Sequence, residues 1–278
     1  VGRVAEVRAL RRADATAAHV CVVGPPGIGK SRLVSELMSD MSPDRVVARV
    51  AGVAYRQHRP YAMARDALTA LVGDPADVSE LTAITGEEHL RALLSLPFDT
   101  DFGQSDAVDQ IDSTFIEAAR HGLIARLVRR RLHESGRRAT LVVEDAQWLD
   151  RATLGLVDVL AGLDDVQLNV VVTSRVDPSA VLGRPEQWVT VPIPPLEPVE
   201  ARRLAIAAAG DTALSDAVLD ALVGEAAGTP LFVISLARSV GRSSDGLLPE
   251  KADAVVAAQI DLLSPADRAL LRETAVLG

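Results

Sequence analysis

The chain has 278 residues, of which 48% are hydrophobic and 24% charged, a composition typical of globular proteins with a buried core. The formal net charge of −9 argues against a dedicated nucleic-acid surface, because phosphate binding depends on clustered cations. The single cysteine excludes an internal disulfide and a cysteine-based zinc site. No apolar run approaches the roughly 20 residues of a membrane helix, and the charged start does not resemble a signal peptide. We therefore expect a cytoplasmic protein that contacts no membrane.

Strands and helices alternate along the first two thirds of the sequence. A helix is predicted over 3–17, and Val-rich runs typical of buried parallel strands lie at 19–23, 45–50, 140–144, 168–174 and 188–193. Helical patterns lie between them, at 30–39, 61–72, 109–134 and 151–162. This alternation predicts an α/β fold with a doubly wound parallel sheet.

The remaining segments are predicted to be helices and loops. Residues 52–139 lack a strong strand signal and hold several helices and a polar loop at 97–106. From Pro194 onward the pattern is helical, with a linker at 241–246 and two more helices in 249–278. Because the chain begins with Val1 and ends within a periodic apolar segment, we expect a fragment of a longer protein.

The segment GPPGIGKS at 24–31 matches the phosphate-binding pattern G-x-x-x-x-G-K-[ST]. Glycines let successive backbone N–H groups converge on a phosphate, and the following helix points its positive dipole end at the same anion. We predict that Lys30 contacts the β- and γ-phosphates and that Ser31 ligates Mg²⁺. The alternative is a Gly-rich turn between a strand and a helix that binds no ligand.

Two carboxylates, Glu144 and Asp145, follow the predicted strand in the segment LVVEDAQWLD at 141–150. In phosphate-loop enzymes the first acid at this place holds Mg²⁺ and the second activates the attacking water. We assign these roles to Glu144 and Asp145 respectively. Asp145 is shorter than the more usual glutamate, which favours slow hydrolysis. The alternative is a helix N-cap at Asp145 or Asp150.

The segment VVVTSR at 170–175 ends another predicted strand with Thr173, Ser174 and Arg175. In an open parallel sheet the ligand chemistry gathers at the carboxyl ends of the strands. A guanidinium at this edge could contact a γ-phosphate and report its presence. The alternative is a surface arginine paired with Asp177 or another carboxylate.

Taken together, these segments resemble the ATPase module of STAND-class, AAA+-related P-loop ATPases, and most closely that of large LuxR-type transcriptional regulators. The resemblance covers nearly the whole chain and rests on motifs in the family's order, which are VGRVAEV, GPPGIGKS, RPYAMARDAL, LVVEDAQWLD, VVVTSR, PPLEPVEARRL, GTPLFVISLA and LSPADRALLRETAVLG. It implies a P-loop NTPase domain over 1–194, a helical lid over 195–241 and the start of a winged-helix region over 242–278.

The resemblance also implies a set of nucleotide-binding residues. It places Gly2 and Arg3 at the adenine edge, Pro230 against the adenine, and Arg175 at the γ-phosphate as a sensor. The phosphates are then held by the loop and the start of its helix, namely Pro26, Gly27, Ile28, Gly29, Lys30, Ser31 and Arg32. Two departures from the family are Thr229, where asparagine is frequent, and the Glu-Asp order of the acidic pair.

By this resemblance the expected function is a switch that binds ATP or ADP with Mg²⁺ and hydrolyses ATP slowly. Its partners would be an effector and, through a C-terminal domain absent from this sequence, DNA, with nucleotide-dependent self-association also possible. The alternatives are an AAA+-type motor or remodelling ATPase, which turns over faster and needs an arginine finger from a neighbouring subunit, and a small-molecule kinase.

Overall fold

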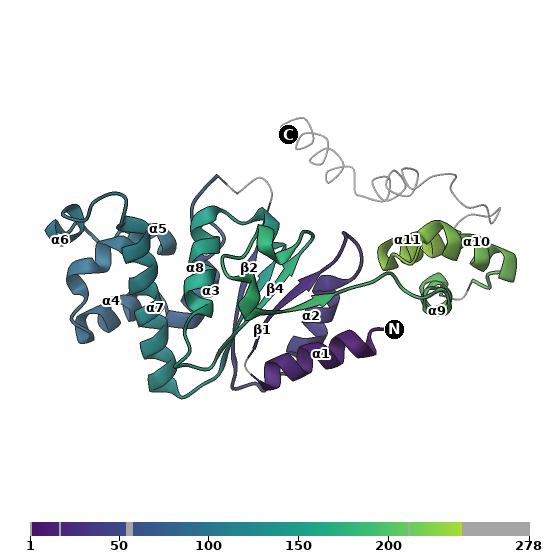
Figure 1. Ribbon diagram of the computed structural model, residues 1–278, viewed down its shortest axis with the longest axis horizontal. Coiled ribbons are helices and arrows are strands. Elements are labelled where there is room, and N and C mark those ends of the chain that lie inside the picture. The colour runs from purple at the N-terminus through teal and green to yellow at the C-terminus, as the bar shows by residue number, and fades with distance from the viewer. Residues whose placement is uncertain (1, 17, 54–57, 211, 241–278) are drawn as a thin grey trace. The chain divides into compact units, whose positions relative to one another are not determined.

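The computed structural model describes residues 2–16, 18–53, 58–210 and 212–240 (Figure 1). These residues form two compact units. One is an α/β unit of residues 4–25 and 30–193, and the other is a helical unit made of residues 2–3, residues 26–29 and the described residues from 194 onward. The predicted linker at 241–246, the helices expected in 249–278 and the winged-helix region expected over 242–278 lie outside the described residues.

The α/β unit is built on five parallel strands in the order β2-β3-β4-β1-β5. Their bounds are β1 His19–Val23, β2 Val46–Ala51, β3 Ala139–Glu144, β4 Leu168–Ser174 and β5 Trp188–Pro192. All five predicted strands are confirmed to within a residue or two. Since every pair is parallel, the carboxyl ends of the strands lie along one edge of the sheet.

Helices cover both faces of this sheet. Figure 1 shows α1 (Val4–Ala15) and α2 (Lys30–Ser39) on one side, and α3 (Arg65–Val72) and α8 (Arg151–Ala161) on the other. The long helix α7 (Ile116–Ser135) packs against α3 and α8. The predicted doubly wound arrangement is therefore confirmed: a parallel sheet with flanking helices.

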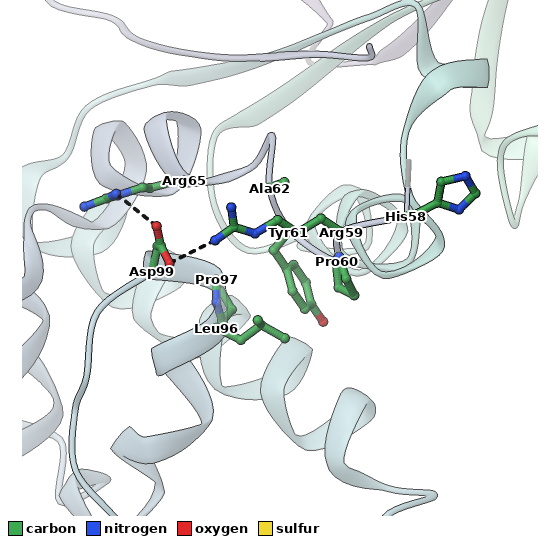
Figure 2. A pocket seen from close by; sticks show the side chains of 9 residues that line it. All are labelled: His58, Arg59, Pro60, Tyr61, Ala62, Arg65, Leu96, Pro97 and Asp99. Carbon is green, nitrogen blue, oxygen red and sulfur yellow. Dashed lines mark hydrogen bonds and ion pairs between the residues drawn. The ribbon is translucent and has the colours of Figure 1, made fainter. Parts of the chain in front are cut away.

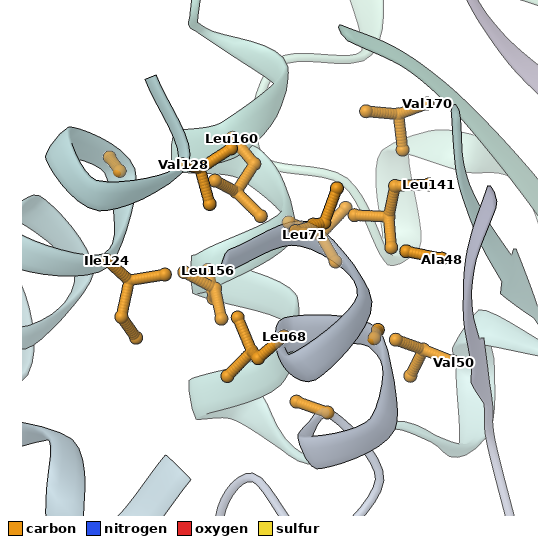
Figure 3. Packing of buried hydrophobic residues seen from close by; sticks show 14 of the residues in the cluster. Ala48, Val50, Leu68, Leu71, Ile124, Val128, Leu141, Leu156, Leu160 and Val170 are labelled. Atoms are coloured by element: carbon orange, nitrogen blue, oxygen red, sulfur yellow. The ribbon is translucent and has the colours of Figure 1, made fainter. Parts of the chain in front are cut away.

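The larger core lies between the sheet and the α3/α7/α8 layer (Figure 3). Alternate strand residues point into it, which is why Ala48 and Val50 of β2 are both buried there while Arg49 between them is exposed. The side chains that meet these strands are aliphatic and come from three helices: Leu68, Leu71, Ile124, Val128, Leu156 and Leu160. With aromatic residues at only 3% of the chain, aliphatic packing holds this layer together.

The segment between β2 and β3 departs from its predicted boundaries. It holds α3, α4 (Pro75–Ile84), a 3-10 helix at Glu88–Leu94, α5 (Ser95–Phe98), α6 (Asp106–Asp109) and α7. The helix expected from residue 61 begins at Arg65, because Tyr61 has a left-handed backbone with a φ of 58°. The helix expected from residue 109 begins at Ile116, because the Asp112 carboxylate accepts a hydrogen bond from the Thr114 N–H and forms a turn.

The helical unit confirms the helices predicted after Pro194. It contains α9 (Pro198–Ala209), α10 (Asp216–Ala226) and α11 (Pro230–Val240). Pro198 occupies the first turn of α9, and the Ser215 side chain accepts from the Val218 N–H to cap α10. The three helices share a small core that includes Ala201, Leu222, Val233 and Leu236.

None of the helices in the described ranges combines the length and the apolar character needed to cross a membrane.

Candidate functional site

Two glycines give the loop between β1 and α2 a left-handed backbone. Gly27 and Gly29 have φ values of 73° and 100°, in the left-handed region that glycine enters without a steric penalty. The loop begins beside β4, where the Gly24 N–H donates to the Ser174 carbonyl at 3.2 Å. Alternating backbone conformations of this kind turn successive N–H groups toward one point and form an anion-binding concavity.

Lys30 is the first residue of α2, and only 7% of it is exposed. Its ammonium donates hydrogen bonds to the carbonyls of Gly24 at 2.7 Å and Pro25 at 3.1 Å. Burial lowers the pKa of Lys30, and Arg175 lowers it further, while Asp145 opposes the shift. The full sequence has only two lysines, Lys30 and Lys251, although Lys plus Arg total 29. The chain therefore uses arginine for nearly all its cations and lysine at this loop.

The acidic pair lies where β3 ends. Glu144 is the last residue of the strand, and its carbonyl accepts from the Gly52 N–H at 2.8 Å. Asp145 follows with a φ of 48°, an uncommon left-handed conformation for a non-glycine residue. Its N–H donates to the Thr173 hydroxyl at 2.9 Å. Contacts with the strands on both sides of β3 thus hold this turn in place.

Asp145 and Arg175 form an ion pair at the strand edge. The Arg175 Nε lies 3.3 Å from the Asp145 Oδ1. Gln147 joins both residues, because its Nε2 donates to the Asp145 Oδ1 at 3.0 Å and its Oε1 accepts from the Arg175 N–H at 3.1 Å. Asp177, the partner considered from the sequence, instead accepts hydrogen bonds from Ser179. Two of the four candidate catalytic residues, Asp145 and Arg175, therefore lie in one hydrogen-bonded network, and Lys30 and Glu144 are the other two.

The helix cap considered for the acidic pair belongs to Asp150. Its carboxylate is buried and accepts from the Thr153 N–H at 2.9 Å and the Thr153 hydroxyl at 2.6 Å, which caps α8. The Asp145 side chain makes the contacts with Gln147 and Arg175 instead. Of the two aspartates considered as helix caps, Asp150 therefore caps α8 and Asp145 does not.

The helical unit brings together the other predicted nucleotide-binding residues. The Arg3 guanidinium donates to the Ile28 carbonyl at 3.4 Å, and the Leu231 N–H, next to Pro230, donates to the Gly27 carbonyl at 3.2 Å. A Cβ on Gly27 would lie 2.9 Å from the Leu231 Cβ, so glycine is needed there for space as well as for conformation.

The remaining predicted residues lie in both units. Gly2 has a φ of 72° and lies against the Glu200 carboxylate. Pro26 and Gly29 belong to the same unit, whereas Ser31 and Arg32 are exposed in the first turn of α2.

Residues 1–173 match the family model described as the AAA ATPase domain. The chain belongs to this family of ATPase domains. No curated protein matches the sequence. Among solved structures, the Walker-type ATPase PABY2304 of Pyrococcus abyssi is similar, with a TM-score of 0.53 and 14% identity over 99% of this chain and 75% of that chain. At this identity the likeness bears on the fold, and the sheet with its flanking helices is that of a P-loop NTPase.

The predicted metal ligands of this AAA ATPase domain are of the chemical kind that Mg²⁺ prefers. The parts of the chain that the structure describes contain no group of three or more His, Cys, Asp or Glu side chains able to hold a metal ion. Ser31 and Glu144 offer a hydroxyl and a carboxylate, the oxygen donors that Mg²⁺ prefers. Mg²⁺ in such sites commonly takes its other ligands from water and substrate phosphates, so a closed protein cage is not required.

Two residues that support Asp145 are not predicted by the sequence analysis. Gln147 lies in the segment LVVEDAQWLD, and nothing in that pattern indicates that its amide joins Asp145 to Arg175. Gly52 follows β2, and a Cβ on it would lie 2.3 Å from the Asp145 carbonyl oxygen. A glycine directly after a strand is a signal for close backbone approach, although it does not say which segment approaches.

Proposed function

We propose that this AAA ATPase domain is a nucleotide switch that binds ATP or ADP with Mg²⁺ and hydrolyses ATP slowly. We further propose that it serves as the NTPase module of a larger STAND-class signalling protein, of the kind found in LuxR-type transcriptional regulators. The ion pair between Asp145 and Arg175 is the observation that carries this proposal. It couples the candidate general base to the candidate sensor of the γ-phosphate.

Each part of the phosphate loop has a role in binding. The backbone of Pro26, Gly27, Ile28 and Gly29 would cradle the phosphates, and Lys30 would exchange its bonds to the loop carbonyls for the β- and γ-oxygens. Ser31 and Glu144 would hold Mg²⁺, which supplies charge neutralisation for the transferred phosphoryl group when bound. Arg32 would lie beside the phosphates, and Gly2, Arg3 and Pro230 would contact the adenine.

The switch depends on a competition for Arg175. In the structure the Arg175 guanidinium pairs with Asp145. A γ-phosphate offers more charge and a matching set of oxygens, so Arg175 would turn toward it and release Asp145 to orient a water. After hydrolysis Arg175 would return to Asp145. ATP and ADP thereby favour different arrangements of one strand edge, which is the differential interaction a switch requires.

Slow turnover follows from the same contacts. The Asp145 Oδ1 accepts from both Gln147 and Arg175, so this oxygen is occupied until Arg175 moves. Aspartate also extends one methylene less toward a water than glutamate does. We assign effector recognition and DNA binding to other parts of the larger protein, as the resemblance to LuxR-type regulators implies.

The lysine content of the chain allows a direct test of nucleotide binding. An acyl-phosphate derivative of ATP transfers its acyl group to the nearest lysine amine and releases ATP, and mass spectrometry then identifies the modified residue. We expect Lys30 to be acylated, ATP or ADP to protect it, and Lys251 to serve as the internal control. Lys30→Ala should abolish binding of a fluorescent nucleotide. Equal labelling of both lysines without protection by ATP would contradict the proposal.

A second experiment separates the switch from a motor. We expect Arg175→Ala to narrow the difference between ATP and ADP affinity, measured by calorimetry with Mg²⁺. The matched control is Arg129→Ala, whose parent residue forms a comparably exposed ion pair with Asp165 on the surface. An unchanged preference for ATP over ADP would remove Arg175 from the sensor role. Turnover of the parent protein above about 1 s⁻¹ that rises with self-assembly would instead favour the motor.

A further inference from the structure

A cavity lies in the α/β unit, between the segment that leads into α3 and the short helix α5. Its volume is about 520 Å³, within the range of about 300–1,000 Å³ that is typical of small-molecule sites. Its walls include Arg59, Tyr61, Arg65, Leu96 and Asp99 (Figure 2). None of these residues belongs to the phosphate loop, the acidic pair or the segment 170–175 that ends in Arg175.

Two arginines in this cavity share a single carboxylate. Figure 2 shows Asp99 between the guanidinium groups of Arg59 and Arg65. The Arg59 Nη2 lies 3.3 Å from one carboxylate oxygen, and the Arg65 Nη1 lies 3.6 Å from the other. Strong guanidinium–carboxylate hydrogen bonds measure about 2.7–2.9 Å, so Asp99 holds both arginines loosely. Each contact involves one nitrogen of a group that carries five N–H donors.

The cavity also has an apolar wall. Leu96 is 46% exposed and lines the cavity beside Pro97. The cavity therefore presents an excess of positive charge together with apolar surface. That combination suits an organic anion, whose charged group pairs with guanidinium forks and whose body covers leucine and proline.

The backbone around the cavity is held in uncommon conformations. Tyr61 and Asp99 have φ values of 58° and 48°, and they are two of the four described non-glycine residues with positive φ. Tyr61 is kept there by buried contacts: its hydroxyl lies 2.7 Å from the His121 Nε2, and its N–H donates to the Asp150 carboxylate at 3.3 Å. Strained residues fixed by their surroundings are found preferentially at ligand clamps and switch regions.

We propose that this cavity binds a small organic anion, a carboxylate or a phosphate ester with an apolar body, through Arg59 and Arg65. Asp99 occupies the arginines in the absence of the ligand and competes with its anionic group. The cavity is also connected to the acidic motif, because Asp150, which accepts from the Tyr61 N–H, lies in the same segment as Glu144 and Asp145. An effect of the ligand on nucleotide turnover rests on the proposed function, whereas binding of the ligand does not.

Phenyl phosphate, benzoate and the neutral benzyl alcohol are suitable probes, with affinities measured by ligand-observed NMR on the full chain. We expect at least one of the two anions to bind, and benzyl alcohol to bind at least tenfold more weakly. Whichever anion binds more tightly identifies the ligand as a phosphate ester or a carboxylate. Failure of both anions to bind, or equal binding of benzyl alcohol, would overturn the proposal.

Variants locate the binding. Arg59→Ala and Arg65→Ala should each weaken the bound anion at least tenfold, and Asp99→Asn should strengthen it at least threefold, because asparagine tolerates the same backbone but does not compete. Arg131→Ala is the control, since Arg131 forms an exposed pair with Asp77 at the same 3.3 Å. Loss of binding in Lys30→Ala with no change in Arg59→Ala and Arg65→Ala would place the anion in the phosphate loop and refute this site. Equal weakening in Arg131→Ala would refute it as well.

Discussion

Gly52→Ala tests whether close packing at the end of β2 positions Asp145. A Cβ at residue 52 would lie 2.3 Å from the Asp145 carbonyl oxygen and 3.1 Å from the Trp148 Cβ, whereas ordinary contacts begin at about 3.4 Å. The two segments must separate by about 1 Å to admit it. β2 cannot simply withdraw, because Ala51 is in register with Glu144 and the Gly52 N–H donates to the Glu144 carbonyl at 2.8 Å. The displacement therefore falls on the turn that carries Asp145.

Two magnitudes follow from this displacement. Forcing an extra methyl group into a packed site costs about 1–3 kcal/mol of unfolding free energy. Misplacing a catalytic group by about 1 Å lowers a rate by about 10²-fold. We expect Gly52→Ala to show both effects, while nucleotide affinity changes little because the atoms nearest to the added Cβ belong to Asp145 and Trp148 and not to the phosphate loop.

The assay combines urea unfolding with Mg²⁺-dependent ATP turnover. Gly122→Ala is the control in the same α/β unit, because a Cβ there would meet only the flexible end of Arg126 at 3.4 Å. A glycine-to-alanine change inside α7 should leave turnover unchanged and stabilise the fold by about 0.5–1 kcal/mol. If Gly52→Ala kept both the stability and the turnover of the parent, the packing argument for Asp145 would be wrong.

Two further predictions concern stability. Asp150→Ala removes three hydrogen bonds to a buried carboxylate, from Tyr61 and Thr153, and should lower the unfolding free energy measured in urea by about 3 kcal/mol. The control Asp74→Ala, at the exposed cap of α4, should lower it by about 1 kcal/mol. Equal losses in the two variants would show that Asp150 acts only as a helix cap. Burial lowers the pKa of His121 below the ordinary histidine value of 6.5, so the unfolded chain binds a proton at a higher pH than the folded chain does. The unfolding free energy should therefore be highest above pH 6.5 and fall as the pH drops below that value. Unfolding in urea at several pH values measures this, and the unfolding free energy of His121→Gln should change less with pH than that of the parent.

The strands could be predicted from the sequence because each is a short, nearly continuous run of Val and similar residues, a pattern that local chemistry dictates. Their order could not. β1 lies between β4 and β5, although β2 follows it in the chain, so the order depends on pairing between segments that are distant in the sequence. The start of α3 also differs from the prediction, because the helix begins at Arg65 and not at residue 61. Tyr61 fits a helical pattern by its spacing, but its contacts with Asp150 and His121 hold it in a left-handed turn instead.

The candidate site was predictable as a set of residues and not as a network. The motifs placed Glu144, Asp145 and Arg175 at strand ends and Lys30 at the start of the helix after the phosphate loop, and parallel pairing then puts those strand ends on one edge. Whether two of them touch depends on strand adjacency and register, which the sequence does not state. β3 and β4 are neighbours, with Val143 opposite Val172, so the residues that follow them lie side by side. Arg175 consequently pairs with Asp145 and not with Asp177, two residues away in the chain.

This adjacency gives a physical reason for joining slow hydrolysis to nucleotide sensing in one proposal. A sensor arginine that paired with a distant carboxylate could respond to a γ-phosphate without affecting the candidate base. Here the same guanidinium neutralises Asp145 and raises the cost of charging Lys30. Any movement of Arg175 toward a phosphate therefore changes the electrostatic surroundings of both residues at once. Gln147 holds the Arg175 backbone in place, because its amide binds the Arg175 N–H and the Asp145 side chain together. Under the proposed switch, ATP would therefore rotate the Arg175 side chain at one strand end, with the Arg175 backbone held by Gln147 and β4 in place.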